Sequence, residues 1–185
     1  RYRSLEGAEG IGRVLLVDQM PIGRTSRSTV STYLGVFDPI RRLFAGTPEA
    51  RLRGWKASRF SFNVSGGRCE NCKGQGRLKM EMSFLPDVYT ACPVCRGQRY
   101  RADTLSARYG HRSIAEVLDM SIGQAADFFH AIPEVAQVLD MAARVGLSYL
   151  KLGQTSPTLS GGEAQRIKLV SELGRASRKE CVYVL

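Results

Sequence analysis

The sequence predicts a mixed fold, α+β or α/β, in which a small metal-bound β module interrupts a mainly helical region. Two CxxC pairs lie near the middle of the 185-residue chain, and short apolar runs typical of strands lie near both ends. Patterns typical of helix starts recur in the second half. We therefore expect three segments: 1–58 with a strand and the first helices, 59–102 with the metal module, and 103–185 with most of the helices.

The first segment begins with a short strand followed by a loop. The run Val14–Asp18 is apolar enough for a buried strand, and Gln19 follows where a loop can present it to a ligand. Residues 28–45 show a helical apolar stripe, which we expect to break at Asp38-Pro39 with Asp38 as the N-cap. A second short helix is predicted from Pro48 to Gly54.

Four cysteines in the middle segment have the spacing of a metal site. Nineteen residues separate the two CxxC pairs, which is typical of two short turns that close on one tetrahedral ion, and the four ligands are Cys69, Cys72, Cys92 and Cys95. Because all four are cysteines, no ligand position is left for water, and Zn²⁺ would be structural. The alternative is two disulfides or buried thiols, but the sequence shows no signal-peptide pattern and disulfides persist mainly in secreted proteins.

The residues around the cysteines are predicted to form strands. Residues 76–84 alternate apolar and polar side chains, which indicates a strand with one dry face, and Pro86-Asp87 would turn the chain back. Phe60–Val64 alternates in the same way. Cys181 lies in the apolar run 181–185, where we expect a buried, unreactive thiol.

The positive charge of the chain is concentrated around the metal segment. Between Arg51 and Arg112 there are 13 Lys or Arg and four Asp or Glu, which accounts for +9 of the overall +10. Phosphate backbones are the expected partner, although a solvated basic face would have the same composition. The candidate DNA contacts are Lys73, Arg77, Lys79, Arg96 and Arg99, with Arg24 and Arg27 in the loop after Gln19. No apolar run is long enough to cross a bilayer, so we expect a soluble, cytoplasmic protein.

The last segment is predicted to be helical. Ser113 with Glu116, and Ser121 with Gln124, fit capping boxes, and Pro133 opens another helix that Gly146 ends. A further helix starts at Ser160, Gly161, Gly162 and Glu163. The two glycines leave backbone amides open to an anion at the positive end of the helix dipole, although an ordinary capped helix would fit equally well.

The stretch Leu159–Arg166 resembles the signature motif of ABC-type ATPases, and its continuation 167–173 resembles the UvrA family of excinuclease proteins. Residues 17–25, 37–41, 59–64, 66–70 and 84–89 resemble the same family in the same order. The resemblance implies part of the second ABC-type nucleotide-binding domain, with a helical signature subdomain and an inserted four-cysteine zinc module.

The resemblance also implies roles for single residues. Gln19 would be the Q-loop glutamine that senses Mg²⁺ and the γ-phosphate of ATP. Ser160, Gly161, Gly162 and Glu163 would close over an ATP molecule held by another nucleotide-binding domain, and the zinc module would lie near the DNA path with Arg24 and Arg27 near the DNA backbone. Damaged double-stranded DNA, a UvrB-type subunit and a second copy of the full-length protein are the implied partners in nucleotide excision repair.

The sequence departs from the family pattern at both catalytic motifs. It contains no GxxxxGK[ST] motif and ends where the strand before the Walker B aspartate is expected, so we expect a fragment that does not hydrolyse ATP alone. The loop 25–30 also leaves open a UvrA paralogue for self-resistance to DNA-binding drugs. Two further alternatives are a DnaJ-type CxxCxGxG module, although Arg99 stands where that repeat has glycine, and an ABC ATPase of transport or translation.

Overall fold

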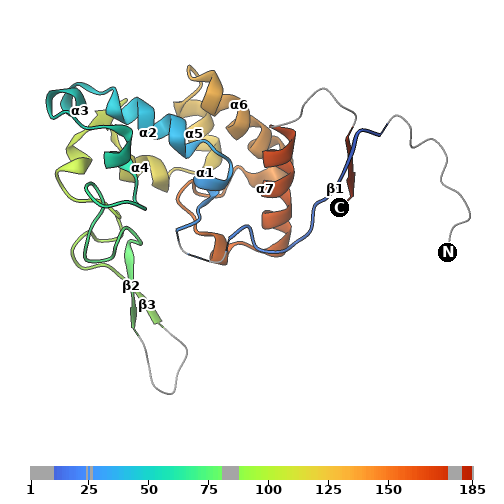
Figure 1. Ribbon diagram of the computed structural model, residues 1–185, viewed down its shortest axis with the longest axis horizontal. Coiled ribbons are helices and arrows are strands. Elements are labelled where there is room, and N and C mark those ends of the chain that lie inside the picture. The colour runs from blue at the N-terminus through green and yellow to red at the C-terminus, as the bar shows by residue number, and fades with distance from the viewer. Residues whose placement is uncertain (1–10, 24, 26, 81–87, 175–180, 185) are drawn as a thin grey trace, which may run out of the picture.

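The computed structural model describes residues 11–23, 25, 27–80, 88–174 and 181–184 (Figure 1). The α-helices are α1 Val30–Tyr33, α2 Phe37–Ala45, α3 Pro48–Leu52, α4 Ile114–Asp119, α5 Ile122–Phe128, α6 Pro133–Ala142 and α7 Gly161–Leu173. The strands are β1 Arg13–Leu16, β2 Arg77–Met80, β3 Val88–Ala91, β4 Arg108–Tyr109, β5 Arg112–Ser113 and β6 Cys181–Val184. Short helical turns are η1 Ala57–Phe60, η2 Thr104–Ser106, η3 Ala143–Leu147 and η4 Ser156–Thr158.

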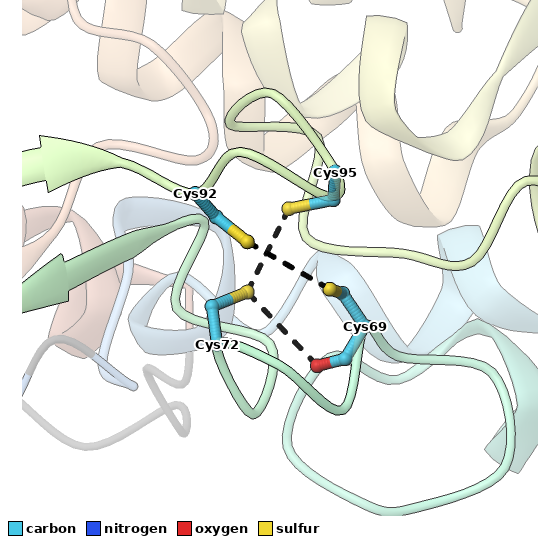
Figure 2. A group of neighbouring side chains, drawn as sticks. All are labelled: Cys69, Cys72, Cys92 and Cys95. Carbon is cyan, nitrogen blue, oxygen red and sulfur yellow. Dashed lines mark hydrogen bonds between the residues drawn. The ribbon is translucent and has the colours of Figure 1, made fainter.

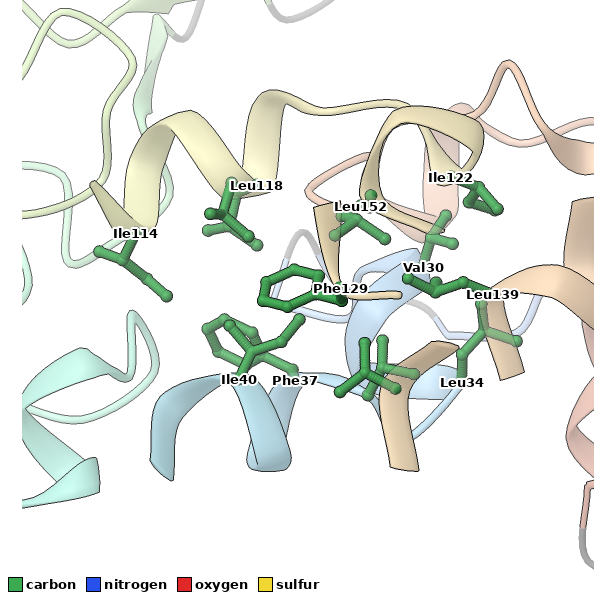
Figure 3. Close-up of a cluster of buried hydrophobic side chains, with 14 of the residues drawn as sticks. Val30, Leu34, Phe37, Ile40, Ile114, Leu118, Ile122, Phe129, Leu139 and Leu152 are labelled. Carbon is green, nitrogen blue, oxygen red and sulfur yellow. The ribbon is translucent and has the colours of Figure 1, made fainter. Parts of the chain in front are cut away.

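The helices enclose one apolar core (Figure 3). Ile114 and Leu118 of α4 point toward Phe37 and Ile40 of α2, with the Phe129 ring near the centre. Complete burial of an aliphatic or aromatic side chain of this size stabilises a fold by about 1.5–3 kcal/mol. The helical body is therefore a stable base from which the metal module extends.

Local sequence sets the starts of three helices as predicted. In α4 and α5, Ser113 and Ser121 each accept a hydrogen bond from the backbone N–H three residues later, and Glu116 and Gln124 accept the return bonds at 2.8 and 3.0 Å. The same reciprocal box opens α7. These confirmed predictions depend only on residues within one helical turn.

The predicted helix 28–45 is divided earlier than expected. Gly35, with φ +76°, separates α1 from α2, and α2 begins at Phe37 with Val36 as a cap that has no side-chain bond. The expected Asp38 cap is therefore wrong, because Asp38 lies in the first turn and pairs with Arg41. Pro39 is tolerated there because the N–H groups of the first turn have no partner within the helix. The predicted helix α3 is confirmed.

The predicted strand at Phe60–Val64 is also wrong. Ser61 N–H donates to Ser58 O at 3.1 Å, which is the bond of a tight helical turn. Phe60 and Phe62 are both buried, and Phe62 packs edge-on against the buried Tyr100. Core packing of the two rings therefore decides the conformation here, rather than strand pairing.

The strands β1 and β6 form a parallel pair in which Arg13 lies opposite Cys181 and Leu16 opposite Val184. The expected burial of this first strand is wrong, because Val14 is 61% and Leu16 74% exposed. Cys181 is half-buried rather than buried. Within the described ranges, each of these strands has one neighbour, so their faces lack the cover that a larger sheet would provide.

The strands β2 and β3 form an antiparallel hairpin that extends from the helical body, at the opposite end of the molecule from β1 and β6 (Figure 1). The predicted dry face is only partly present. Leu78 packs against the cysteines, whereas Met80 is 51% exposed. The rest of the predicted alternation and the turn at Pro86-Asp87 lie outside the described residues.

Candidate functional site

The four predicted ligands come together in one buried cluster (Figure 2). Their Sγ atoms all lie within 4.8 Å of one another, with Cys69 to Cys92 at 3.9 Å and Cys72 to Cys95 at 3.6 Å. No disulfide joins them. Four sulfurs arranged tetrahedrally about 2.3 Å from a zinc ion would be about 3.8 Å apart, so the observed separations fit a single Zn²⁺.

The two CxxC turns repeat the same backbone path. After Cys72, Lys73 and Gly76 have positive φ angles of 49° and 76°, and after Cys95 the equivalent Arg96 and Arg99 have 50° and 70°. Arg99 thus takes the left-handed conformation that glycine takes in the first turn, which is the position where a DnaJ-type repeat would have glycine. The side chain of Arg99 is tolerated here although this conformation favours glycine.

The first turn packs closely on the helical body through Gly74. A Cβ atom at Gly74 would lie 1.8 Å from the carbonyl oxygen of Phe62. The metal cluster and the aromatic core therefore meet at a backbone contact that only glycine permits.

Backbone and side-chain donors surround the sulfurs. Gly76 N–H donates to Cys72 Sγ at 3.2 Å, and Asn71 Nδ2 donates to Cys92 Sγ at 3.3 Å. Burial alone would raise the pKa of Cys92, but the bonds from Asn71 and from the amides of Cys95 and Val94 lower it to about 6. Burial raises the pKa of Cys95 to about 12.

The donor set and its surroundings fit a structural zinc ion. Such N–H···S bonds disperse the negative charge of the thiolates and hold the ligands in place. The four thiols would have to lose their protons when the metal binds, and the donors to Cys92 favour that step.

The basic residues of the module fall into two groups. Lys73, Lys79 and Arg96 are exposed. The guanidinium groups of Arg77 and Arg99 instead turn to the helical body, where Arg99 Nη2 donates to Gly153 O at 2.9 Å and Arg77 Nη2 to Thr155 Oγ1 at 3.3 Å. In the loop after Gln19, Arg27 is exposed, whereas Arg24 lies outside the described residues.

A cleft of about 1350 Å³ lies between the hairpin and the helices α4 and α5. Tyr89 and Thr90 line it on the hairpin side, and Asp119 and Gln124 line it on the helical side. Open space therefore lies between these hairpin residues and the two helices.

The second candidate site is the start of α7. Ser160 N–H donates to Glu163 Oε2 at 2.7 Å, and the hydroxyl of Tyr149 donates to Glu163 Oε1 at 2.6 Å. The bond from Tyr149 is the main reason that the pKa of Glu163 lies below its ordinary value. A Cβ atom at Gly162 would meet no atom within 4 Å, so this helix end is open to a ligand.

Gln19 lies beside the start of α7, and this proximity could not be predicted from the sequence. A Cβ at Gly161 would lie 3.2 Å from the Gln19 side chain, and Gln19 Nε2 donates to Gln165 Oε1 at 3.4 Å. The neighbouring Asp18 forms an ion pair with Lys168 of α7. The two predicted nucleotide-facing elements, the Gln19 loop and the start of α7, therefore lie next to each other.

Three contributors were not predicted from the sequence: Asn71, Tyr149 and Gln165. Asn71 lies inside the first CxxC pair, so its position was a usable signal. Tyr149 and Gln165 reach their partners through tertiary packing, which no local pattern encodes.

A basic four-cysteine module inserted into a helical subdomain, together with a serine-capped, glycine-opened helix beside a glutamine loop, defines a segment of an ABC-type nucleotide-binding domain. No protein-family model matches the chain. The chain is, however, 57% identical over 184 residues to "UvrABC system protein A" of Thermus thermophilus and 54% identical over 184 residues to the protein of that name from Deinococcus radiodurans. Both alignments cover the whole chain but 19% and 18% of the relatives.

A solved structure agrees with these sequence matches. The crystal structure of UvrA2 from Deinococcus radiodurans matches 94% of this chain and 21% of its own with a TM-score of 0.89 and 53% identity. The chain is a segment of the UvrA type, and it spans about a fifth of the length of these relatives. This similarity does not favour a DnaJ-type module or an ABC ATPase of transport or translation. In Deinococcus radiodurans, UvrA and UvrA2 are about equally similar to the chain.

Proposed function

We propose that this chain is the zinc-bearing part of the second nucleotide-binding domain of a DNA damage-recognition ATPase. In this proposal, segment 59–102 is the zinc module, and 1–58 and 103–185 supply the strand, the glutamine loop and the signature subdomain. The observation that carries the proposal is the buried four-cysteine cluster, which fixes a basic hairpin onto the body that also holds the capped helix α7.

The proposed nucleotide role belongs to the start of α7. Ser160, Gly161 and Gly162 would face the γ-phosphate of an ATP molecule, held with Mg²⁺ by a second nucleotide-binding domain, while Gln19 would sense the metal and γ-phosphate at its own site. The open space at Gly162 and the proximity of Gln19 support this assignment. Hydrolysis also needs the Walker A and Walker B residues, so we do not expect this chain to hydrolyse ATP alone.

The proposed DNA role belongs to the exposed basic residues Lys73, Lys79 and Arg96, with the exposed Arg27 in the loop after Gln19. Arg24, which lies outside the described residues, is proposed for the same role from the sequence alone. Phosphate contacts carry no base-sequence information, which suits recognition of chemically diverse lesions through the backbone and the deformability of the duplex. Because Arg77 and Arg99 have protein partners, we assign them to the attachment of the hairpin rather than to DNA.

The implied partners follow from the same proposal. A full-length protein with this segment would act with a UvrB-type subunit on damaged double-stranded DNA, as a homodimer in the cytoplasm. Among the described residues, no helix is both long and apolar enough to span a membrane.

The experiment that tests this proposal is a salt titration of DNA binding. In a full-length UvrA-type protein that carries this segment, Lys73→Ala together with Arg96→Ala should weaken duplex binding. The log–log salt dependence should become shallower by roughly two, about one for each lost phosphate contact. Arg51→Ala on α3 removes an exposed charge outside the module and should leave the slope unchanged. An unaltered slope in the double variant would exclude this surface from the interface.

A further inference from the structure

Residues 153–158, which we call the junction, lie between the zinc hairpin and the nucleotide-facing elements. The junction is held firmly by the body. Gly153 N–H donates to Leu118 O at 2.7 Å, and Gln154 O accepts from Val30 N–H at 3.0 Å. Thr155 also forms a β-bridge with Thr29. Because the junction is short and hydrogen-bonded to its neighbours, we expect a displacement of one end of it to move the residues that contact the other end.

On one side, the junction receives the two arginines of the module. Arg99 donates to the carbonyl of Gly153 and Arg77 to the hydroxyl of Thr155. Aromatic rings hold both guanidinium groups in place, since Arg99 lies 5.0 Å from the Phe62 ring centroid and Arg77 4.8 Å from that of Tyr89. Arg77 at the start of β2 and Arg99 after the second CxxC pair therefore both form polar contacts between the module and the junction.

On the other side, the junction contacts both nucleotide-facing elements. Ser156 Oγ donates to Gly23 O at 2.7 Å, within the loop that follows Gln19. The turn η4 then leads from Ser156 to Ser160, which caps α7. The acceptor of Arg77 and the N-cap of the signature helix are therefore close neighbours along the chain.

Each of the two arginines of the module has a buried nitrogen whose N–H group makes no hydrogen bond. Arg99 Nη1 and Arg77 Nε are buried, and neither has a hydrogen-bond partner in this arrangement. A small shift of the hairpin would let each guanidinium group exchange one acceptor for another while it stays bound to the junction. That property suits a contact that has to persist in two arrangements.

We propose that Arg77 and Arg99 are positioning residues that couple DNA engagement by the zinc module to the nucleotide site through the junction. This inference rests on the proposed function, because it requires that the module binds DNA and that α7 faces ATP. DNA on the hairpin would shift the two arginines, and the junction would pass that shift to the Gln19 loop and to the cap of α7.

The test uses a full-length, zinc-loaded UvrA-type protein that carries this segment. Arg99→Gly removes the side chain and suits the left-handed backbone, while Thr155→Val removes the acceptor of Arg77 from outside the module. In both variants, the stimulation of ATP hydrolysis by saturating duplex DNA should fall about fivefold or more, which is the lower end of typical coupling factors. Arg99→Lys, which keeps a donor for Gly153 O, should restore much of the stimulation.

Arg96→Gly is the matched control. It removes the same charge from the same kind of left-handed position in the same turn, but the Arg96 side chain is exposed. This variant should weaken DNA affinity and still reach full stimulation once DNA is saturating. Measurement of zinc content in every variant separates a loss of coupling from a loss of the metal site.

The outcomes distinguish the two proposals. Full stimulation in zinc-loaded Arg99→Gly and in Thr155→Val would overturn the coupling. A loss in Arg99→Gly that Arg99→Lys does not reverse and Thr155→Val does not reproduce would overturn it as well. If the Arg99→Gly variant loses its zinc, the stimulation of ATP hydrolysis measured for the Thr155→Val variant decides whether the coupling exists. A wild-type protein that does not hydrolyse ATP, or does not bind DNA, would instead overturn the proposed function.

Discussion

The four sulfurs of the metal cluster differ chemically, although the sequence repeats the same CxxC motif. Cys92 accepts bonds from Asn71 and from two backbone amides, which lower its pKa to about 6 despite burial. For Cys95, burial dominates and raises the pKa to about 12. Asn71, a residue between the cysteines of the first pair, therefore influences the chemistry of a sulfur in the second pair.

We predict that Asn71→Ala weakens zinc binding by roughly tenfold or more, which is the usual effect of losing a group that orients a metal ligand. The variant removes the 3.3 Å donor to Cys92 Sγ but no ligand. Competition with a chelating dye measures the affinity. Gln98→Ala changes an exposed amide close to the second CxxC pair and serves as the control. Equal affinity in both variants would show that the bond from Asn71 contributes nothing.

At the start of α7, we predict that Tyr149→Phe raises the pKa of Glu163 toward its ordinary value of 4.5. The lowered pKa of folded Glu163 means that its contribution to stability is present above the unfolded value and is lost as the pH falls through the folded one. Without the hydroxyl of Tyr149, this contribution to stability should be smaller, and its loss should be complete at a higher pH. An NMR titration of the Glu163 carboxyl measures the shift. Tyr89→Phe in the hairpin is the control, and an unchanged titration of Glu163 in Tyr149→Phe would contradict the prediction.

At the scale of elements, the starts of three helices were predictable from the sequence because the contacts that determine them are local. The capping boxes at Ser113, Ser121 and Ser160 were predictable because both bonds form within four residues. The break in 28–45 was misplaced because Gly35 and Asp38-Pro39 are both plausible breaks, and only core packing selects between them. The strand predicted at Phe60–Val64 was wrong for a related reason. The alternation of apolar and polar residues that is typical of a strand also occurs in a turn that buries the rings of Phe60 and Phe62 in one core.

The close contact between the first CxxC turn and the core leads to a prediction about two glycines. Gly74 and Gly97 have similar φ angles, 80° and 87°, but a Cβ would meet Phe62 O at 1.8 Å at Gly74 and no atom within 4 Å at Gly97. Gly97→Ala should cost about 1–2 kcal/mol for the left-handed backbone alone. Gly74→Ala should cost about 1–3 kcal/mol more, because the turn has to move away from Phe62.

Denaturant unfolding of the zinc-loaded chain measures both free energies, and Gly97→Ala is the matched control for the backbone term. Equal losses in the two variants would mean that the turn and the core are not in close contact. A larger loss at Gly97 would contradict the structure directly.

At the scale of the whole molecule, the sequence indicated the class of fold, the four-cysteine cluster and the capped helix that begins at Gly161, but not how the parts are joined. Charge alone grouped Arg77 and Arg99 with the exposed Lys73 and Arg96, because composition does not show which way a side chain points. The exposed apolar faces of β1 and β6 were unpredictable for a similar reason: burial of a strand depends on neighbours that its own residues do not specify.

The metal cluster and the apolar core are two separate hydrophobic clusters within the described residues, and this separation sets the last prediction. The core contains residues of the helices together with Phe60, Phe62 and Tyr100 of segment 59–102, whereas only Leu78 packs on the four cysteines from outside them. The two CxxC turns and the hairpin, which have so little apolar support, therefore depend on the metal, since the free energy of metal binding is largely free energy of folding in such small sites.

We therefore predict that a chelator unfolds the two CxxC turns and the hairpin, and leaves the apolar core and its helices folded. Hydrogen exchange of the zinc-loaded chain should show protection at both CxxC turns and in β2 and β3. After removal of one zinc ion per chain, this protection should be lost while α4 to α7 keep theirs. Cys181→Ser, which changes the half-buried fifth cysteine, should behave like wild type. Unfolding of the whole chain on chelation would show that the body also depends on the metal, and unchanged protection at the turns would show that the cysteines hold the module without it.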